Sequence, residues 1–132
     1  MTSTIRKIQT DNAPAPAGHY SQAVVHGGLV FVSGQLPIVP ETGEKLTGPI
    51  EEQTLQVLKN VSAILDASGS SLDQVLKVTV YISDIELWGK MNEVYSEFFG
   101  DYKPARAAVP TRDLNFGFQI EIEAIAAVGD QG

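Results

Sequence analysis

The hydrophobic pattern along the chain changes repeatedly between the period of a β-strand and that of an α-helix. Residues 120–126 alternate strictly, with isoleucine and alanine on one side and Glu121 and Glu123 on the other, which indicates a strand with one buried face. Residues 75–82 (VLKVTVYI) are rich in β-branched side chains and predict a central strand. Residues 29–32 are apolar on both faces and predict a strand that is covered on both sides.

Two segments follow the helical period instead. From Ile50 onward, apolar residues recur at helical spacing, and Gly69 fits the end of this helix. Asp84 is a candidate N-cap for a second helix, which Gly100 ends. The apolar stripe of the second helix, which we expect to pack in the core, consists of Leu87, Trp88, Met91, Val94, Tyr95, Phe98 and Phe99.

The remaining segments complete a β-β-β-α-β-α-β-β order. Residues 4–8 predict a short edge strand, residues 21–25 begin an extended run, and Gly27–Gly28 predicts a hairpin turn. Residues 37–49 are rich in proline and glycine and predict a loop. We therefore expect one α+β domain over residues 1–132, with a mixed sheet and both helices on one face.

This arrangement leaves the second face of the sheet without a cover. Two helices cover one face, yet residues 29–32 and 75–82 are apolar on both. Because the predicted elements leave no other segment for this task, a second copy of the chain is the simplest cover. The sequence therefore predicts a homo-oligomer.

Composition narrows the classes of function. The 132 residues, 43% of them hydrophobic, suit one globular domain. The chain has no cysteine and two histidines, so it offers neither a disulfide framework nor the ligands of a typical zinc centre. A formal net charge of −7 without a basic cluster disfavours nucleic-acid binding. The lack of a long apolar run or a signal-peptide core predicts a soluble, cytoplasmic protein.

The segment from residue 103 to residue 126 carries the candidate chemistry. Arg106 stands among alanines shortly after Pro104, which predicts that it begins a strand with room around its guanidinium. A guanidinium binds a carboxylate through two parallel hydrogen bonds, so Arg106 is a candidate anion clamp. Glu121 or Glu123 is a candidate base. On spacing alone, a surface arginine and a solvated glutamate face are the alternative interpretation.

Several motifs, in their order and separation, resemble the RidA (YjgF) family. The resemblance extends from about Asn12 to Val128. Its motifs are Gly18 with Tyr20-Ser21-Gln22-Ala23, Ser33-Gly34-Gln35, a helical Asn92, Pro104-Ala105-Arg106 before small residues, Leu114 to Gly117, and the alternating residues 120–126.

The resemblance implies a fold, an assembly and an activity. RidA-like proteins adopt a chorismate-mutase-like α+β fold and form homotrimers, whose sheets line a central barrel and whose active sites lie between subunits. They are enamine/imine deaminases that need no cofactor. They hydrolyse reactive 2-aminoacrylate and 2-iminobutanoate to 2-oxo acids and ammonia. The expected partners are therefore a small 2-imino or 2-amino-enoic acid and further copies of the chain, with neither nucleic acid nor membrane.

The resemblance also implies roles for individual residues. Arg106 matches the arginine that holds the substrate carboxylate, and Glu121 matches the glutamate that positions or activates water. Tyr20 matches the tyrosine that closes the pocket. Ser33 follows an apolar strand and is expected in a pocket wall or a β-bulge, not as a nucleophile. The other expected binding residues, with no metal ligand among them, are Gly34, Asn92 and the backbone of Ala108.

Three departures from the family pattern bear on specificity. His19 stands where the family usually has proline, and Pro110 is expected to change the local strand pairing. Phe116 and Phe118 flank a glycine in a loop that is often more polar. We expect these positions to reshape the pocket rim, and so to affect substrate preference more than the chemistry.

Three other functions stay open at this point. A non-catalytic trimeric binder of small carboxylates, acting as a sensor or regulator, would use the same Arg106 clamp. A deaminase of another enamine, such as 2-aminomuconate, is compatible with the altered rim. An RNA-active protein, as attributed to relatives, conflicts with the net charge of −7 and the lack of a basic stripe.

Overall fold

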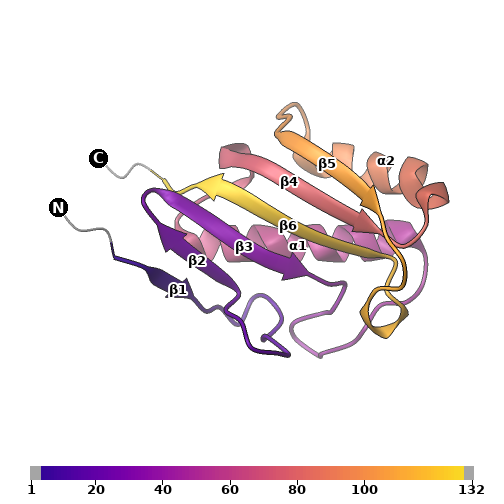
Figure 1. Ribbon diagram of the computed structural model, residues 1–132, viewed down its shortest axis with the longest axis horizontal. Coiled ribbons are helices and arrows are strands. Elements are labelled where there is room, and N and C mark those ends of the chain that lie inside the picture. The colour runs from indigo at the N-terminus through magenta and orange to yellow at the C-terminus, as the bar shows by residue number, and fades with distance from the viewer. Residues whose placement is uncertain (1–3, 130–132) are drawn as a thin grey trace.

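The computed structural model describes residues 4–129 and contains the predicted order of strands and helices (Figure 1). The strands are β1 (Arg6–Ile8), β2 (Ala23–His26), β3 (Leu29–Gln35), β4 (Val75–Ile82), β5 (Ala105–Pro110) and β6 (Ile120–Ala127). The helices are α1 (Ile50–Ser68) and α2 (Trp88–Phe99). Short 3₁₀ turns precede β4, α2 and β6, namely η1 (Leu72–Gln74), η2 (Ile85–Leu87) and η3 (Asn115–Gly117).

The six strands form one mixed sheet in the order β1-β2-β3-β6-β4-β5. All neighbouring pairs are antiparallel except β4 and β5, which run parallel. A parallel pair needs a crossover connection, and α2 supplies it. Because β1 and β5 are the edge strands, Arg106 in β5 stands at an edge of the sheet.

Both helices lie on one face of the sheet, behind it in Figure 1. α1 packs against β3, β6 and α2, and it ends at Gly69, whose φ of 83° is the left-handed conformation that glycine adopts without strain. Ile120 and Ile122 of β6 point toward the helices and are fully buried. The predicted alternation of residues 120–126 and the α+β class with two helices on one face are therefore confirmed. No helix within residues 4–129 has the length and apolar character needed to cross a membrane.

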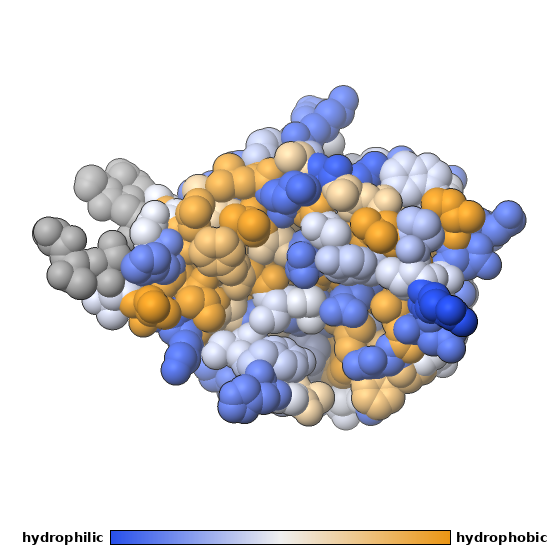
Figure 2. Space-filling model, viewed as in Figure 1, coloured by the Kyte–Doolittle hydropathy of each residue, from blue (hydrophilic) through white to orange (hydrophobic). Residues whose placement is uncertain are grey.

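The opposite face of the sheet is open. Phe31 of β3 and Leu76 of β4 are 45% and 46% exposed, although both are large apolar residues. Figure 2 looks onto this face and shows hydrophobic side chains gathered where β3, the end of β6 and the start of β4 lie. An exposed apolar patch of this kind marks an interaction surface. That another copy of the chain covers it stays a prediction.

The start of α2 differs from its prediction by one turn. Asp84 does act as a cap, because its Oδ1 accepts a hydrogen bond from the Glu86 N–H over 2.9 Å. It caps η2, however, and α2 begins only at Trp88. The side chain of Asp84 therefore organises the turn that leads into the helix.

The prediction that Pro110 changes the local strand pairing is wrong. Pro110 is in register with Ile82 of β4, and the next residue, Thr111, donates its N–H to the Ile82 carbonyl over 2.7 Å. Since β5 is an edge strand, the missing N–H of Pro110 falls on the side away from β4 and costs no ladder hydrogen bond.

Candidate active site

Arg106 lies on the helix-facing side of β5, where α2 holds its guanidinium. The Cζ atom lies 4.7 Å from the ring centre of Trp88 and 4.6 Å from that of Tyr95. Nη1 donates a hydrogen bond to Asn92 Oδ1 over 2.8 Å, the one hydrogen bond that the Arg106 side chain makes within residues 4–129. The two rings and the amide fix the guanidinium plane, while most of its five N–H donors are left for an anion.

Helical spacing explains why these three residues meet Arg106. Trp88, Asn92 and Tyr95 stand at positions i, i+4 and i+7 of α2 and therefore share one side of the helix. The structure corrects the expectation that the apolar stripe of α2 packs only in the core. Tyr95 is buried but Trp88 is 36% exposed, and both rings contact the guanidinium.

Glu121 lies on the open face of the sheet, beside an irregularity in β3. The register between β3 and β6 shifts between Val32 and Gln35, and Gly34 stands within this shift. The carboxylate of Glu121 occupies the space that a β-carbon at position 34 would fill. A glycine is therefore needed there for the carboxylate to approach the backbone of β3.

Ser33 and Tyr20 belong to the same part of the open face. The Ser33 hydroxyl donates to the carbonyl of Ser21 over 2.7 Å, so it ties β3 to the preceding loop, and the β-bulge interpretation of this serine is confirmed. Tyr20 is 49% exposed and lines a cavity of about 230 Å³ together with Gly34 and Phe116. Gly34 thus connects the cavity of Tyr20 with the carboxylate of Glu121.

The electrostatics around Glu121 suit proton transfer. Burial and then the negative charge of Glu123 raise the pKa of the Glu121 carboxyl above its ordinary value. Tyr81 stands opposite Glu121 in β4, and burial, followed by the charges of both glutamates, raises the pKa of its hydroxyl. A carboxylate whose pKa is raised is a stronger base and accepts a proton from water more readily.

Within one chain, Arg106 and Glu121 lie on opposite faces of the sheet. Arg106 is in register with Val78, which is buried beneath the helices, whereas Glu121 is in register with Tyr81 on the open face. The expectation that residues 103–126 supply clamp and base side by side is therefore wrong for a single chain. A site that uses both groups requires two copies.

The expected rim residues separate into exposed and buried positions. Phe116 is 57% exposed and has a φ of 58°, a left-handed conformation that bulky residues rarely adopt, and Lys45 Nζ lies 4.9 Å from its ring centre. Phe118 is 1% exposed and belongs to the interior, so only Phe116 can shape a rim. His19 is exposed, and Ala108 is partly buried in β5, two residues after the clamp.

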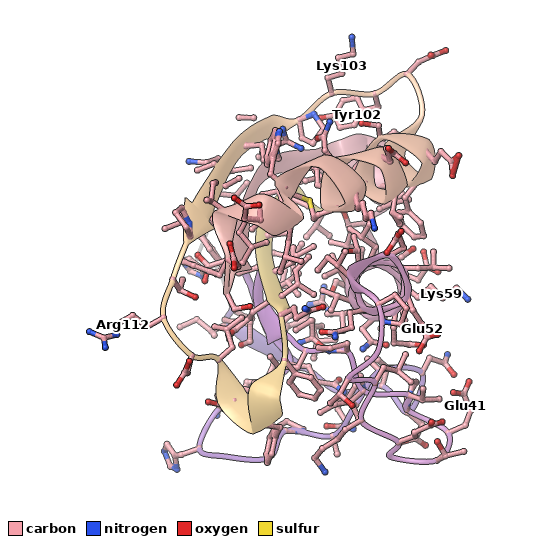
Figure 3. The ribbon with its side chains drawn as sticks, turned by 90° about the vertical axis from the view of Figure 1, so that its right-hand side faces the viewer. Glu41, Glu52, Lys59, Tyr102, Lys103 and Arg112 are labelled. Carbon is pink, nitrogen blue, oxygen red and sulfur yellow. The ribbon has the colours of Figure 1, made fainter. Side chains whose placement is uncertain are left out.

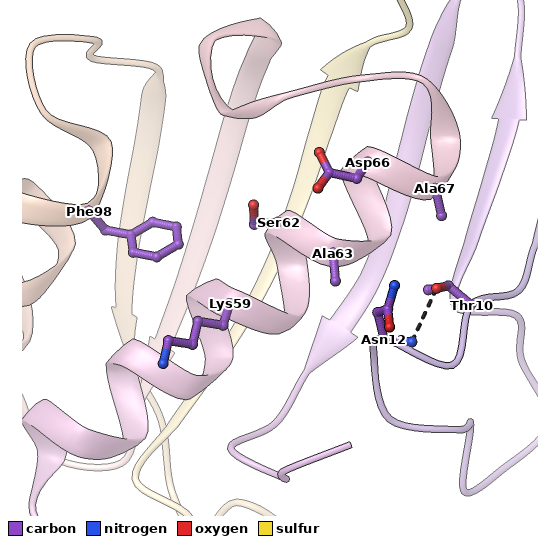
Figure 4. Close-up of a pocket in the computed structure, with 8 residues that line it drawn as sticks. All are labelled: Thr10, Asn12, Lys59, Ser62, Ala63, Asp66, Ala67 and Phe98. Carbon is purple, nitrogen blue, oxygen red and sulfur yellow. Dashed lines mark hydrogen bonds between the residues drawn. The ribbon is translucent and has the colours of Figure 1, made fainter. Parts of the chain in front are cut away.

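Three larger cavities lie on the helical side of the molecule. One of about 460 Å³ follows the seam between α2 and β5, and we call it the α2–β5 cleft; among its lining residues are Asn92, Tyr95, Ser96, Phe99, Tyr102 and Arg106. Figure 3 shows Tyr102 and Lys103 in the turn that joins α2 to β5, with Lys103 directed outward. Another, of about 550 Å³, lies on the outer side of α1, and Figure 4 shows that its polar side chains do not converge on one point. The third, of about 560 Å³, lies between α1 and α2, away from the residues of the candidate site. The candidate site therefore includes only the first cavity. Across residues 4–129, no group of three or more histidine, aspartate or glutamate side chains is placed to hold a metal ion.

Comparison with known proteins gives the family. The profile of the endoribonuclease L-PSP family matches residues 10–128, most of the chain. The protein therefore belongs to this family, which is the RidA (YjgF) family that its motifs resemble.

Relatives and solved structures agree with this assignment. A RutC family protein of Pyrococcus horikoshii is 56% identical over 119 residues, 90% of this chain and 94% of its own. The 2-iminobutanoate/2-iminopropanoate deaminase of Rattus norvegicus is 45% identical, over 98% of this chain and 95% of its own. The crystal structure of E. coli TdcF with bound serine matches with a TM-score of 0.88 at 39% identity, covering 92% of this chain and 98% of that one. The predicted RidA-type fold is thereby confirmed.

Proposed function

We propose that this protein hydrolyses reactive 2-imino and 2-amino-enoic acids, of the 2-iminobutanoate and 2-aminoacrylate type, to 2-oxo acids and ammonia in the cytoplasm. The observation that carries the proposal is the guanidinium of Arg106, fixed by α2 with donors left for a carboxylate. The name of the rat relative, a 2-iminobutanoate/2-iminopropanoate deaminase at 45% identity, supports the same reaction.

In the proposed complex, the substrate carboxylate pairs with Arg106. The reacting carbon is bonded directly to that carboxylate, so holding the carboxylate also sets the position of the imine and removes much of the orientational entropy of the reaction. Asn92 keeps the guanidinium from rotating, and the backbone of Ala108, on the same side of β5, borders the bound acid.

Glu121 of a neighbouring copy then acts as the general base that activates the attacking water. The carboxylate accepts a proton from water as the oxygen bonds to the imine carbon and the C=N electrons move to nitrogen. The protonated Glu121 returns the proton to this nitrogen. As the C–N bond breaks and the C=O bond forms, the Glu121 carboxylate takes the proton of the new hydroxyl and passes it to the departing ammonia, so the protonated imine and water give the 2-oxo acid and ammonium. The raised pKa of Glu121 suits the steps in which it accepts a proton. Tyr20, with Ser33 and Gly34 behind it, closes the pocket over the substrate.

The proposal includes a homotrimer, with the open faces of the sheets lining its centre. Two observations favour an assembly of copies: the exposed apolar side chains of the open face, such as Phe31 and Leu76, and the separation of Arg106 and Glu121 within one chain. Burial of the apolar face drives the assembly of the copies. Contact between the β5 edge of one copy and the Gly34 region of the next brings Arg106 and Glu121 into one site.

A non-catalytic carboxylate binder is the second candidate. The observation in its favour is that one chain by itself presents the Arg106 clamp without a carboxylate base beside it. The related E. coli TdcF was crystallised with bound serine. A binder would hold 2-oxo acids without hydrolysing imines, so turnover separates the two functions.

The experiment generates 2-iminobutanoate in situ with a threonine dehydratase and follows the formation of 2-oxobutanoate. Semicarbazide traps the imine that is left. We expect the protein to accelerate hydrolysis, Arg106→Ala to lose the acceleration, and Arg112→Ala to keep it. Arg112 is a matched control because it is an exposed arginine that points away from the fold (Figure 3). If the protein binds 2-oxobutanoate but does not accelerate imine hydrolysis, the deaminase proposal is wrong and the non-catalytic binder is the better assignment.

A further inference from the structure

The α2–β5 cleft extends well beyond the guanidinium that holds a carboxylate in the proposed reaction. Its volume of about 460 Å³ falls within the range of roughly 300–1,000 Å³ that is typical of pockets for drug-sized ligands. A four-carbon acid on Arg106 fills only part of such a space. The rest of the cleft is therefore available to a longer side chain on the same acid.

Tyr95 lines this cleft beside Arg106. Tyr95 is 6% exposed and its hydroxyl oxygen is sealed from solvent. The Tyr95 ring lies 4.6 Å from the Arg106 Cζ, and a ring face attracts a guanidinium. Tyr95 therefore holds the guanidinium in place at one end of the cleft.

The walls of the cleft are aromatic and fixed in position. The rings of Tyr95 and Phe99 are 4.8 Å apart at an angle of 37°. The Tyr102 hydroxyl is bonded to the carbonyl of Val75, which anchors this ring from the opposite side. Aromatic faces that are held before binding lose little entropy when a flat ring packs on them. The cleft is thus shaped for an aromatic group.

The charge of the cleft selects an anion. Its charged lining residues are Lys103 and Arg106, and no carboxylate is found among the described residues that line it. This is unusual for the chain, which has 16 acidic residues against 9 basic ones. A ligand that combines a carboxylate with an aromatic ring matches both the positive charge and the aromatic walls of the cleft.

We propose that the α2–β5 cleft is a side-chain subsite for aromatic 2-imino and 2-oxo acids. Their carboxylate pairs with Arg106, which the Tyr95 ring holds in place, and their ring packs against Phe99 and Tyr102. The inference rests on the proposed function and names the substrate class of that site. The reaction itself is unchanged, because water adds to the imine carbon, ammonia leaves, and the ring takes no part.

The test measures binding of two stable 2-oxo acids by calorimetry, with the assembled protein. 2-Oxobutanoate probes the clamp alone, and phenylpyruvate probes the clamp and the subsite. Ser96→Phe places a ring in the cleft from an exposed position of α2 and is the blocking variant. Glu97→Phe is the matched control, because Glu97 is the next residue of α2, is also exposed and does not line the cleft.

We expect wild type to bind phenylpyruvate about tenfold or more tightly than 2-oxobutanoate, since the ring buries apolar surface. Ser96→Phe should reduce this preference about tenfold, and Glu97→Phe should preserve it. Equal affinity of wild type for the two acids, or an unchanged preference in Ser96→Phe, overturns the subsite. Because these are binding measurements, they separate from the imine assay: a protein that fails to hydrolyse 2-iminobutanoate but shows the predicted preference loses the deaminase function and keeps the subsite.

Discussion

The carboxylate of Glu121 lies over Gly34, in the space where any other residue would place its β-carbon. The two residues come from different strands, β6 and β3, and meet where the register between these strands shifts. The contact fixes where the proposed base can stand, because the backbone of β3 forms the floor beneath it.

Gly34→Ala is predicted to lower kcat by about tenfold or more, since a displaced base no longer meets the attacking water in line. The nearest atoms are the end of a flexible side chain, so the added methyl group moves the carboxylate and the melting temperature changes little. Gly89→Ala is the control, because a β-carbon at that position in α2 meets no atom within 4 Å. A wild-type kcat for Gly34→Ala would show that the placement of Glu121 is unimportant.

Glu121→Gln is predicted to stabilise the protein at neutral pH while reducing kcat by about 100-fold or more. Burial and the charge of Glu123 raise the pKa of Glu121, so the folded state binds this proton more tightly than the unfolded state. The stability that Glu121 contributes is complete below its ordinary pKa of about 4.3 and is lost as the pH rises through the raised value. The gain from glutamine should therefore be present at pH 7 and vanish near pH 4, in denaturant melts at matched protein concentration. A gain that grows on acidification would contradict the raised pKa.

Trp88→Leu is predicted to raise KM by about 3- to 30-fold with little change in kcat, because one ring that holds the Arg106 guanidinium is lost. Trp88→Phe keeps an aromatic face and should recover most of the affinity. The split between KM and kcat distinguishes this role from a purely structural one. If both variants change only the melting temperature, the ring has no part in binding the carboxylate.

Phe31→Asp is predicted to dissociate the assembly and to abolish activity together with it. Phe31 is 45% exposed on the open face, where a charge cannot be buried against another copy without a large cost. Light scattering should report about three chain masses for wild type and one for the variant. Leu55→Asp is the matched control, since Leu55 is 39% exposed on the outer side of α1 and should leave the assembly intact. An active monomer would refute a site that is shared between copies.

The order of elements could be predicted from the sequence because period and capping are local signals. The alternation in residues 120–126 specifies a strand with one buried face, and the glycine at position 69 specifies the end of α1. Ser33, a hydroxyl in an apolar strand, predicted either a pocket wall or a β-bulge, and the register shift of β3 bears out the bulge.

The geometry of the site could not be predicted in the same way, because it depends on contacts between distant segments. Trp88 and Tyr95 belong to an apolar stripe that is typical of a core, and only the position of β5 turns them toward Arg106. Their spacing with Asn92, at i, i+4 and i+7, was the available signal. The separation of Arg106 and Glu121 follows from strand register, which alternation alone does not define across β4.

Subunit complementation tests the central claim most directly, namely that Arg106 of one copy and Glu121 of another form one active site. Arg106→Ala and Glu121→Gln chains, each inactive alone, are coexpressed with different tags, and assemblies that carry both are isolated. In a trimer that carries both variants, an intact arginine faces an intact glutamate at one site in three, so imine hydrolysis should return to about a third of the wild-type rate. If the mixed assemblies are no more active than the separate variants, the two residues do not act across an interface between copies.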